Sequence, residues 1–210
     1  MQSFIRSAPD TLILWTIQAP AAWAKLRKDG VLLARRRNLT EESWTDAYEW
    51  MMSRMEERIG APPESDCIPL WAWARWGGMK RRRPDLRAAG HLSKGEEGVR
   101  IEFQQAADSV VLSDFGLWHF VLNYWYLPHS EEDEIVFEAK LNSRGLSFFH
   151  DKPLPDADLH SEMTDSWERI FDLEWFHPEI TNVPEERSVQ ATMWELRWDQ
   201  VRRYKWFKSK

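Results

Sequence analysis

Hydrophobic positions in the first part of the chain follow two different periods. The run TLILWTI at residues 11–17 is almost continuously apolar and lies between Pro9 and Pro20, which predicts a buried strand. A short helix is predicted next, over the sequence APAAWAKLRKDG. Pro20 near its start and Gly30 near its end are typical of helix boundaries. The chain therefore opens with a strand, a helix and a glycine turn.

The clearest predicted helix begins after Thr40, a candidate N-cap, and ends before Gly60. Its apolar residues recur at helical spacing, and they are Trp44, Ala47, Tyr48, Met51, Met52, Met55 and Ile59. We expect this stripe, rich in methionine, to face the core.

The remaining pattern predicts further strands and helices in alternating groups. Strands are predicted over residues 67–76, 98–103, 108–115 and 188–198. Helices are predicted over residues 115–128 behind Ser113 or Asp114, from Ser130 with Asp133 as a capping box, and near residues 163–176. This order predicts a single α+β domain over residues 1–210, with a mixed or mainly antiparallel sheet and several packed helices.

Composition places the 210-residue chain among soluble globular proteins. Hydrophobic residues make up 43% and charged residues 30%, and no apolar run approaches the roughly 18 residues of a membrane span. The single Cys67 has no disulfide partner in the chain, which favours a reducing, cytoplasmic setting. Fourteen tryptophans are unusual; they indicate either an aromatic core or surfaces on which planar ligands stack.

Charge is unevenly distributed along a chain whose net charge is −6. Six basic residues fall within 75–87 and six more within 197–210, each block opposed by one aspartate. Such blocks are either solvated faces or surfaces for a nucleic-acid or nucleotide partner. On the second interpretation, the residues that contact phosphates in the first block are Lys80, Arg81, Arg82, Arg83 and Arg87.

Several kinds of chemistry lack their usual motifs. The six histidines show no H-x-x-x-H or H-E-x-x-H spacing, so we expect no metal site. The sequence also contains no P-loop, no G-x-G-x-x-G fingerprint and no G-x-S-x-G elbow.

Five segments together resemble an uncharacterised family of short bacterial proteins of unknown function. The family pattern combines L-W-T-I-Q, W-A-W, P-D-L-R, L-S-D-F…W-H-x-V-L-N and Q-A-T-x-W-E. Here these motifs are Leu14–Gln18, Trp71–Trp73, Pro84–Arg87, Leu112–Asn123 and Gln190–Glu195. The resemblance covers nearly the whole chain and implies no particular activity.

The two ends of the chain also resemble ADP-ribosyltransferases, especially those that modify thymidine in DNA. Such enzymes open with a strand, a helix and a glycine, as in LWTIQAPAAWAKLRKDG, and end on a Q-A-E strand with a catalytic glutamate. The resemblance implies that NAD is the substrate, that Glu195 is catalytic, and that the acceptor is a nucleic acid or a protein. The cofactor-binding residues that it implies are Thr16, Gln18, Trp73, Gln190 and Thr192.

The closing strand departs from the transferase pattern at one position. Thr192 stands where the catalytic glutamate belongs, and Glu195 follows three positions later. A carboxylate is needed to stabilise the oxocarbenium-like state formed when the nicotinamide–ribose bond breaks. In a regular strand, odd spacing places Glu195 on the face opposite Thr192, unless a bulge intervenes.

Three hypotheses follow from the sequence. The first is an ADP-ribosyltransferase-like enzyme that uses NAD. The second is a non-catalytic protein that binds nucleic acid or nucleotides through the basic loop 75–87 and the basic tail 197–210. The third is an interaction protein whose aromatic residues form its core and whose charges face solvent.

Overall fold

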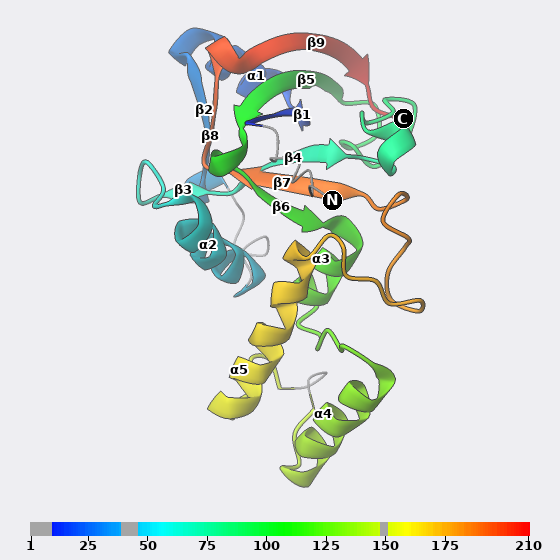
Figure 1. Ribbon diagram of the computed structural model, residues 1–210. Helices are drawn as coiled ribbons and strands as arrows, with labels where there is room; N and C mark the ends of the chain where they lie inside the picture. The colour runs from blue at the N-terminus through cyan, green and yellow to red at the C-terminus, as the bar shows by residue number, and fades with distance from the viewer. Residues whose placement is uncertain (1–9, 39–45, 148–150) are drawn as a thin grey trace, which may run out of the picture.

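The computed structural model describes residues 10–38, 46–147 and 151–210, and these residues form an α+β fold (Figure 1). A six-stranded sheet has the order β6-β7-β4-β1-β5-β9, and a three-stranded sheet has the order β3-β2-β8. The pairings between these strands are antiparallel. The predicted fold class and the mainly antiparallel sheet are therefore confirmed.

The elements are bounded as follows. The strands are β1 (Thr11–Gln18), β2 (Val31–Arg35), β3 (Cys67–Ile68), β4 (Leu70–Arg75), β5 (Glu97–Ala106), β6 (Val111–Asp114), β7 (Val189–Met193), β8 (Glu195–Arg197) and β9 (Val201–Lys208). The helices of the described residues are α1 (Pro20–Asp29), α2 (Asp46–Ile59), α3 (Phe115–Leu122), α4 (Glu131–Ser143) and α5 (Ala157–Ser166). The segment predicted as a basic tail is thus an edge strand, β9.

Side-chain caps define the starts of two helices. The Asp114 carboxylate accepts two backbone N–H groups in the first turn of α3, at 2.7 and 3.1 Å. Of the two predicted candidates, Asp114 and not Ser113 is therefore the cap. The Ser130 hydroxyl accepts the backbone N–H of Asp133 at 3.2 Å, so the predicted N-cap is present, whereas the Asp133 carboxylate accepts the backbone N–H of His129 rather than that of Ser130. The predicted N-cap Thr40 lies outside the described residues.

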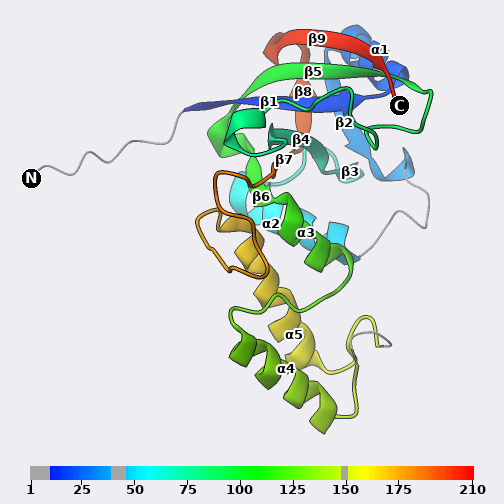
Figure 2. The same cartoon turned by 90° about the vertical axis from the view of Figure 1, so that its right-hand side faces the viewer.

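Helices cover both faces of the large sheet. On one face, Trp23 and Leu26 of α1 pack in a buried cluster with Leu14 and Ile101. Figure 2 shows α1 near β5 and β9, whereas α2 and α3 lie below β6 and β7. The second cluster, on the side of α2 and α3, includes the predicted methionine stripe; Met51 is fully buried there.

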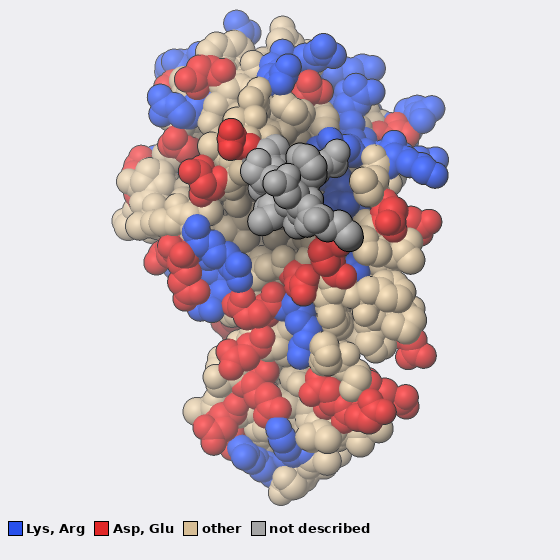
Figure 3. All heavy atoms as spheres, viewed as in Figure 1, with Lys and Arg blue, Asp and Glu red and all other residues tan. Residues whose placement is uncertain are grey.

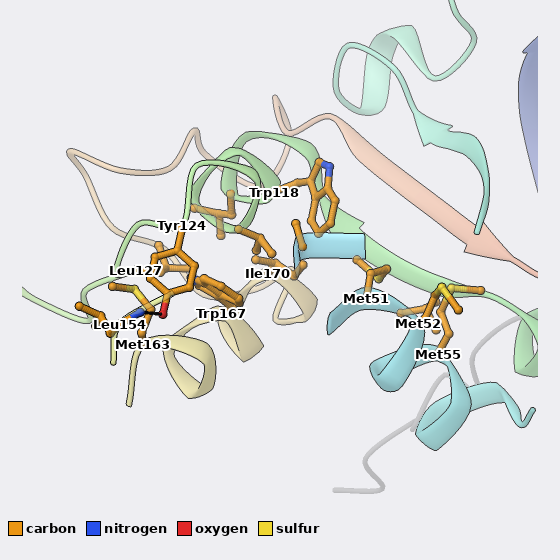
Figure 4. Packing of buried hydrophobic residues seen from close by; sticks show 14 of the residues in the cluster. Met51, Met52, Met55, Trp118, Tyr124, Leu127, Leu154, Met163, Trp167 and Ile170 are labelled. Atoms are coloured by element: carbon orange, nitrogen blue, oxygen red, sulfur yellow. Dashed lines mark hydrogen bonds between the residues drawn. The ribbon is translucent and has the colours of Figure 1, made fainter. Parts of the chain in front are cut away.

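The second cluster continues into a lobe of helices that extends away from the sheets (Figures 1 and 2). Figure 4 shows Met55 of α2, Trp118 of α3 and Met163 of α5 among its buried side chains. Trp167, which is 1% exposed, donates its indole N–H to the carbonyl oxygen of Trp125 at 2.7 Å. The aromatic residues of this lobe therefore serve mainly as core.

Two predicted strands are each divided between the two sheets. Pro69 separates β3 from β4, because a proline has no N–H group with which to continue a ladder. Trp194 separates β7 from β8; its indole N–H donates to the carbonyl of Gly60 at 2.8 Å. Leu70, the first residue of β4, pairs with Met193, the last residue of β7. The two breaks at Pro69 and Trp194 are therefore neighbours in space.

Candidate functional site

A pocket of about 780 Å³ lies between the basic loop, residues 75–87, and the strands β1, β5 and β9. We call it the basic pocket. Its lining residues are Trp15, Trp76, Met79, Lys80, Arg81, Arg82, Arg83, Pro84, Asp85, Leu86, Arg87, Arg100, Glu102 and Lys205. Figure 3 shows Lys and Arg side chains gathered at the upper right of the molecule, over this loop and the end of β9.

Strand alternation supplies the floor of the pocket. In β5, Val99 and Ile101 face the buried cluster under α1, so Arg100 and Glu102 project from the other face. Glu102 pairs in register with Trp15, and Arg100 pairs with Lys205. Side chains from three neighbouring strands therefore meet on one face of the sheet.

The Trp15 indole and the Glu102 carboxylate are joined directly. Nε1 of Trp15 donates a hydrogen bond of 3.0 Å to Oε2 of Glu102. The other carboxylate oxygen, Oε1, lies 4.0 Å from Nε of Arg203. The guanidinium carbon of Arg82 stands 5.9 Å from the centre of the Trp15 ring, within the range of a cation–π contact.

Hydrogen bonds to the backbone groups of the basic loop hold it against the rest of the protein. Nη1 of Arg100 donates to the carbonyl of Pro84 at 2.7 Å, and the Met79 N–H donates to the carbonyl of Glu185 at 2.7 Å. Gly78 has φ of 76°, and a Cβ there would lie 2.4 Å from that same Glu185 oxygen. Only glycine fits this approach, so the position of the loop depends on it.

The cations of the loop differ in their partners. Asp85 pairs with Arg87 at 2.7 Å, and the hydrogen bonds from Arg87 hold the pKa of the Asp85 carboxyl below its ordinary value. Beneath the loop, burial lowers the pKa of Arg100 of β5, and the nearby positive charge of Arg83 lowers it further. Among the described residues, no ion pair involves the four consecutive cations from Lys80 to Arg83. Their positive charge therefore faces the cavity and the solvent.

The predicted phosphate-contacting residues all line this pocket: Lys80, Arg81, Arg82, Arg83 and Arg87. The residues predicted to bind NAD are distributed differently. Trp15 pairs in register with Trp73, so Thr16 projects from the opposite face of the sheet. The Thr16 hydroxyl donates to the carbonyl of Trp71 at 2.8 Å and accepts from Nε2 of Gln18 at 2.7 Å.

Trp73, Gln190 and Thr192 lie on the face opposite Thr16, because Trp73 pairs with Gln190 in register. Oε1 of Gln190 and the hydroxyl of its register partner Ser113 are buried, and neither has a hydrogen-bond partner among the described residues. Thr192 is completely buried and its hydroxyl lies 3.9 Å from the sulfur of Met51. Thr192 is therefore part of the core, whereas Trp73 and Gln190 lie side by side.

Glu195 lies in the other sheet. It belongs to β8, pairs in register with Leu33, and stands 3.6 Å from Nη1 of Arg197. The break at Trp194 thus carries Glu195 out of the strand that holds Gln190. The structure brings Trp73 and Gln190 together but does not bring Thr16, Gln18 or Glu195 to them.

Sequence analysis placed Lys205 in the proposed basic tail but missed three residues of the basic pocket, which are Trp15, Arg100 and Glu102. A signal for two of them existed in the segment GVRIEF, where charged Arg100 and Glu102 alternate with buried apolar residues. The strand pairing that unites them with Trp15 and Lys205 has no local signal.

Two further observations concern metal ligands and helix length in the described residues. They contain no group of three or more His, Cys, Asp or Glu side chains that could hold a metal ion. Their helices are also too short or too polar to cross a membrane.

Comparison with known proteins places the chain in a family. Residues 13–202 match the model of a family described as a domain of unknown function, DUF3841. No curated protein and no solved structure matches the chain.

Proposed function

This chain belongs to the DUF3841 family, and we propose that it binds the phosphate groups of a nucleotide or a nucleic-acid strand in the basic pocket. The observation that carries the proposal is the run of cations from Lys80 to Arg83, exposed above a pocket whose wall includes Trp15 and Trp76. Neighbouring cations repel one another, and a phosphate-bearing ligand relieves this repulsion.

The local charge supports this proposal despite the net charge of −6. Charges are screened over about 8–10 Å at physiological ionic strength, so distant acidic residues do little to cancel the field within the pocket. Arg100 and Lys205 add positive charge from the floor. A cavity of about 780 Å³ also falls within the roughly 300–1,000 Å³ of ordinary small-ligand sites.

The aromatic walls favour a nucleotide over a simple anion. Trp76 is half-buried at the start of the basic loop and lines the pocket. Stacking of a base on an indole tolerates any base sequence, because every base has a π-face. The pocket therefore combines the two features that single-stranded nucleic acids and nucleotides require.

Transfer of ADP-ribose from NAD stays a prediction. It requires a carboxylate beside the reacting ribose, and Glu195 is in a different sheet from Trp73 and Gln190. The direct assay is nicotinamide release from NAD by the wild type and by Glu195→Gln. Release that is lost in this variant would support the transferase hypothesis.

Fluorescence anisotropy with a labelled oligoadenylate, with ATP as competitor, tests the binding proposal. We expect affinity to fall with salt, with a slope of about −0.7 per phosphate contact in a plot of log affinity against log salt. The double variant Arg81→Glu with Arg83→Glu should lose most of the binding; it spares Arg82, which lies over Trp15.

The matched control is Arg27→Glu with Lys28→Glu on α1, which changes net charge equally on the other side of the sheet. This control should bind nearly as well as the wild type. Equal weakening by both double variants, or salt-independent binding, would show that the basic pocket is not the binding site.

A further inference from the structure

We propose that the ligand of the basic pocket carries a ribose, and that Glu102 accepts a hydrogen bond from its 2′-hydroxyl. This inference rests on the proposed phosphate-binding function. It begins from an imbalance in the pocket, whose lining contains seven Lys and Arg residues but only two acids, Asp85 and Glu102.

The two acids are in different states. Asp85 is occupied by Arg87, which contacts it through both its side chain and its backbone N–H. Within the part of the chain that the structure describes, Glu102 receives one hydrogen bond, from the Trp15 indole to Oε2. Its Oε1 lies 4.0 Å from Nε of Arg203, at the limit of ion-pair distance, and the charge of Glu102 also acts on Arg100. Glu102 therefore keeps acceptor capacity that points into the pocket.

A carboxylate on the floor imposes a direction on the ligand. It repels phosphate, so the phosphates lie toward the basic loop, near Lys80, Arg81 and Arg83. An ionised carboxylate can only accept hydrogen bonds, so the ligand group over Glu102 must be a donor. In a nucleotide the donors nearest to the phosphates are the sugar hydroxyls, and a 2′-hydroxyl is present in ribose and absent from deoxyribose.

The burial of Glu102 strengthens this selectivity. Its side chain is 19% exposed, so a ligand that covers the pocket removes most of its remaining water. A ligand without a donor then leaves Oε1 of this charged carboxylate without a hydrogen bond, which costs more than an ordinary lost hydrogen bond. A ribonucleotide avoids this cost through its 2′-hydroxyl. A DNA strand has no sugar hydroxyl to donate between its ends, because each 3′-oxygen is esterified, and free dATP keeps only its 3′-hydroxyl and offers none at the 2′ position.

The experiment compares ligands that differ in the 2′-hydroxyl. We expect ATP to bind about tenfold to a hundredfold more tightly than dATP, measured by calorimetry, or labelled rA12 to exceed labelled dA12 by a similar factor in anisotropy. A preference confined to ATP identifies a free ribonucleotide as the ligand, and a preference seen with the oligonucleotides identifies RNA.

Glu102→Gln is the decisive variant, because the amide oxygen still accepts the Trp15 indole N–H while the charge is lost. In this variant we expect the ratio of the affinities for ATP and dATP to fall to near one, largely because the deoxy ligand binds more tightly. The matched control is Glu97→Gln, an exposed residue of the same strand whose side chain projects from the other face. It should keep the wild-type preference, and thermal unfolding of both variants verifies the fold.

The outcomes separate this inference from the proposed function. Salt-dependent binding of ATP and dATP with equal affinity would overturn the role of Glu102 and leave phosphate binding intact. An unchanged ribose preference in Glu102→Gln would also overturn it. Absence of binding by all four ligands would overturn both proposals.

Discussion

The guanidinium of Arg187 lies 3.6 Å from the carboxylate of Asp114, and both side chains are almost fully buried. The same guanidinium donates hydrogen bonds to the carbonyls of Leu173, Trp175 and Asn182. This ion pair therefore holds the segment before β7 against the start of α3. The segment in turn carries the Glu185 carbonyl that anchors the basic loop.

We expect Arg187→Met to lower the free energy of unfolding by about 3–5 kcal/mol, because it leaves the Asp114 carboxylate buried without its ionic partner. Guanidinium denaturation followed by circular dichroism measures this change. The control is Arg197→Met, whose exposed pair with Glu195 is worth at most about 1 kcal/mol. A similar loss in both variants would contradict the structural role of Arg187.

Gly78→Ala should weaken both stability and ligand binding. The backbone at Gly78 has φ of 76° and ψ of −172°, and its new Cβ would clash with the Glu185 carbonyl. We expect a cost of about 1–3 kcal/mol and a displaced basic loop. Gly90→Ala has a similar positive φ but open space around it, so it should cost about 1 kcal/mol. Denaturation and the anisotropy assay compare the two, and equal effects on binding would contradict the anchoring role of Gly78.

Tyr126 should make stability depend on alkaline pH. Burial, followed by the hydrogen bond to Asp133, raises the pKa of the Tyr126 hydroxyl well above its ordinary value. A raised folded-state pKa contributes stability that is fully present below about pH 10 and is lost as pH rises through the folded-state pKa.

We therefore expect Tyr126→Phe to lower the free energy of unfolding by about 1 kcal/mol at pH 8 and to reduce its decline above pH 10. Urea denaturation from pH 8 to pH 12 provides the measurement. Identical pH dependence in wild type and variant would rule out this contribution.

Met55→Ala should be among the most damaging substitutions of α2. Met55 is fully buried in the cluster that α2 shares with α3 and α5, so its removal leaves a cavity. We expect a cost of about 2–5 kcal/mol in thermal or chemical unfolding. Ile135→Ala on α4 serves as the control, because Ile135 is 58% exposed and should change stability by less than about 0.5 kcal/mol. Comparable losses would mean that the methionine stripe is not core.

Local patterns predicted the features that depend on neighbouring residues. The methionine stripe of α2 follows from helical spacing, and the caps at Asp114 and Ser130 follow from residue type next to an apolar run. The basic loop was equally visible, because Lys80 to Arg83 are consecutive. These features required no knowledge of which strands are neighbours.

The closing strand shows where local patterns end. Alternation could determine whether Gln190 and Glu195 share a face only if both belonged to one regular strand. The indole of Trp194 is instead buried and bonded to the carbonyl of Gly60, and the chain changes sheets there. The decisive contact joins residues 134 positions apart, so it has no signature in the strand itself.

The basic pocket combines both kinds of information. By itself the sequence determined the cations of the basic loop and the alternation that exposes Arg100 and Glu102 on one face of a strand. Only the tertiary structure decided that Glu102 pairs with Trp15 of β1 and Arg100 with Lys205 of β9, so that these side chains lie together beneath the basic loop. The physical reason is that alternation fixes the face of a residue, whereas strand order results from burying the whole chain at once.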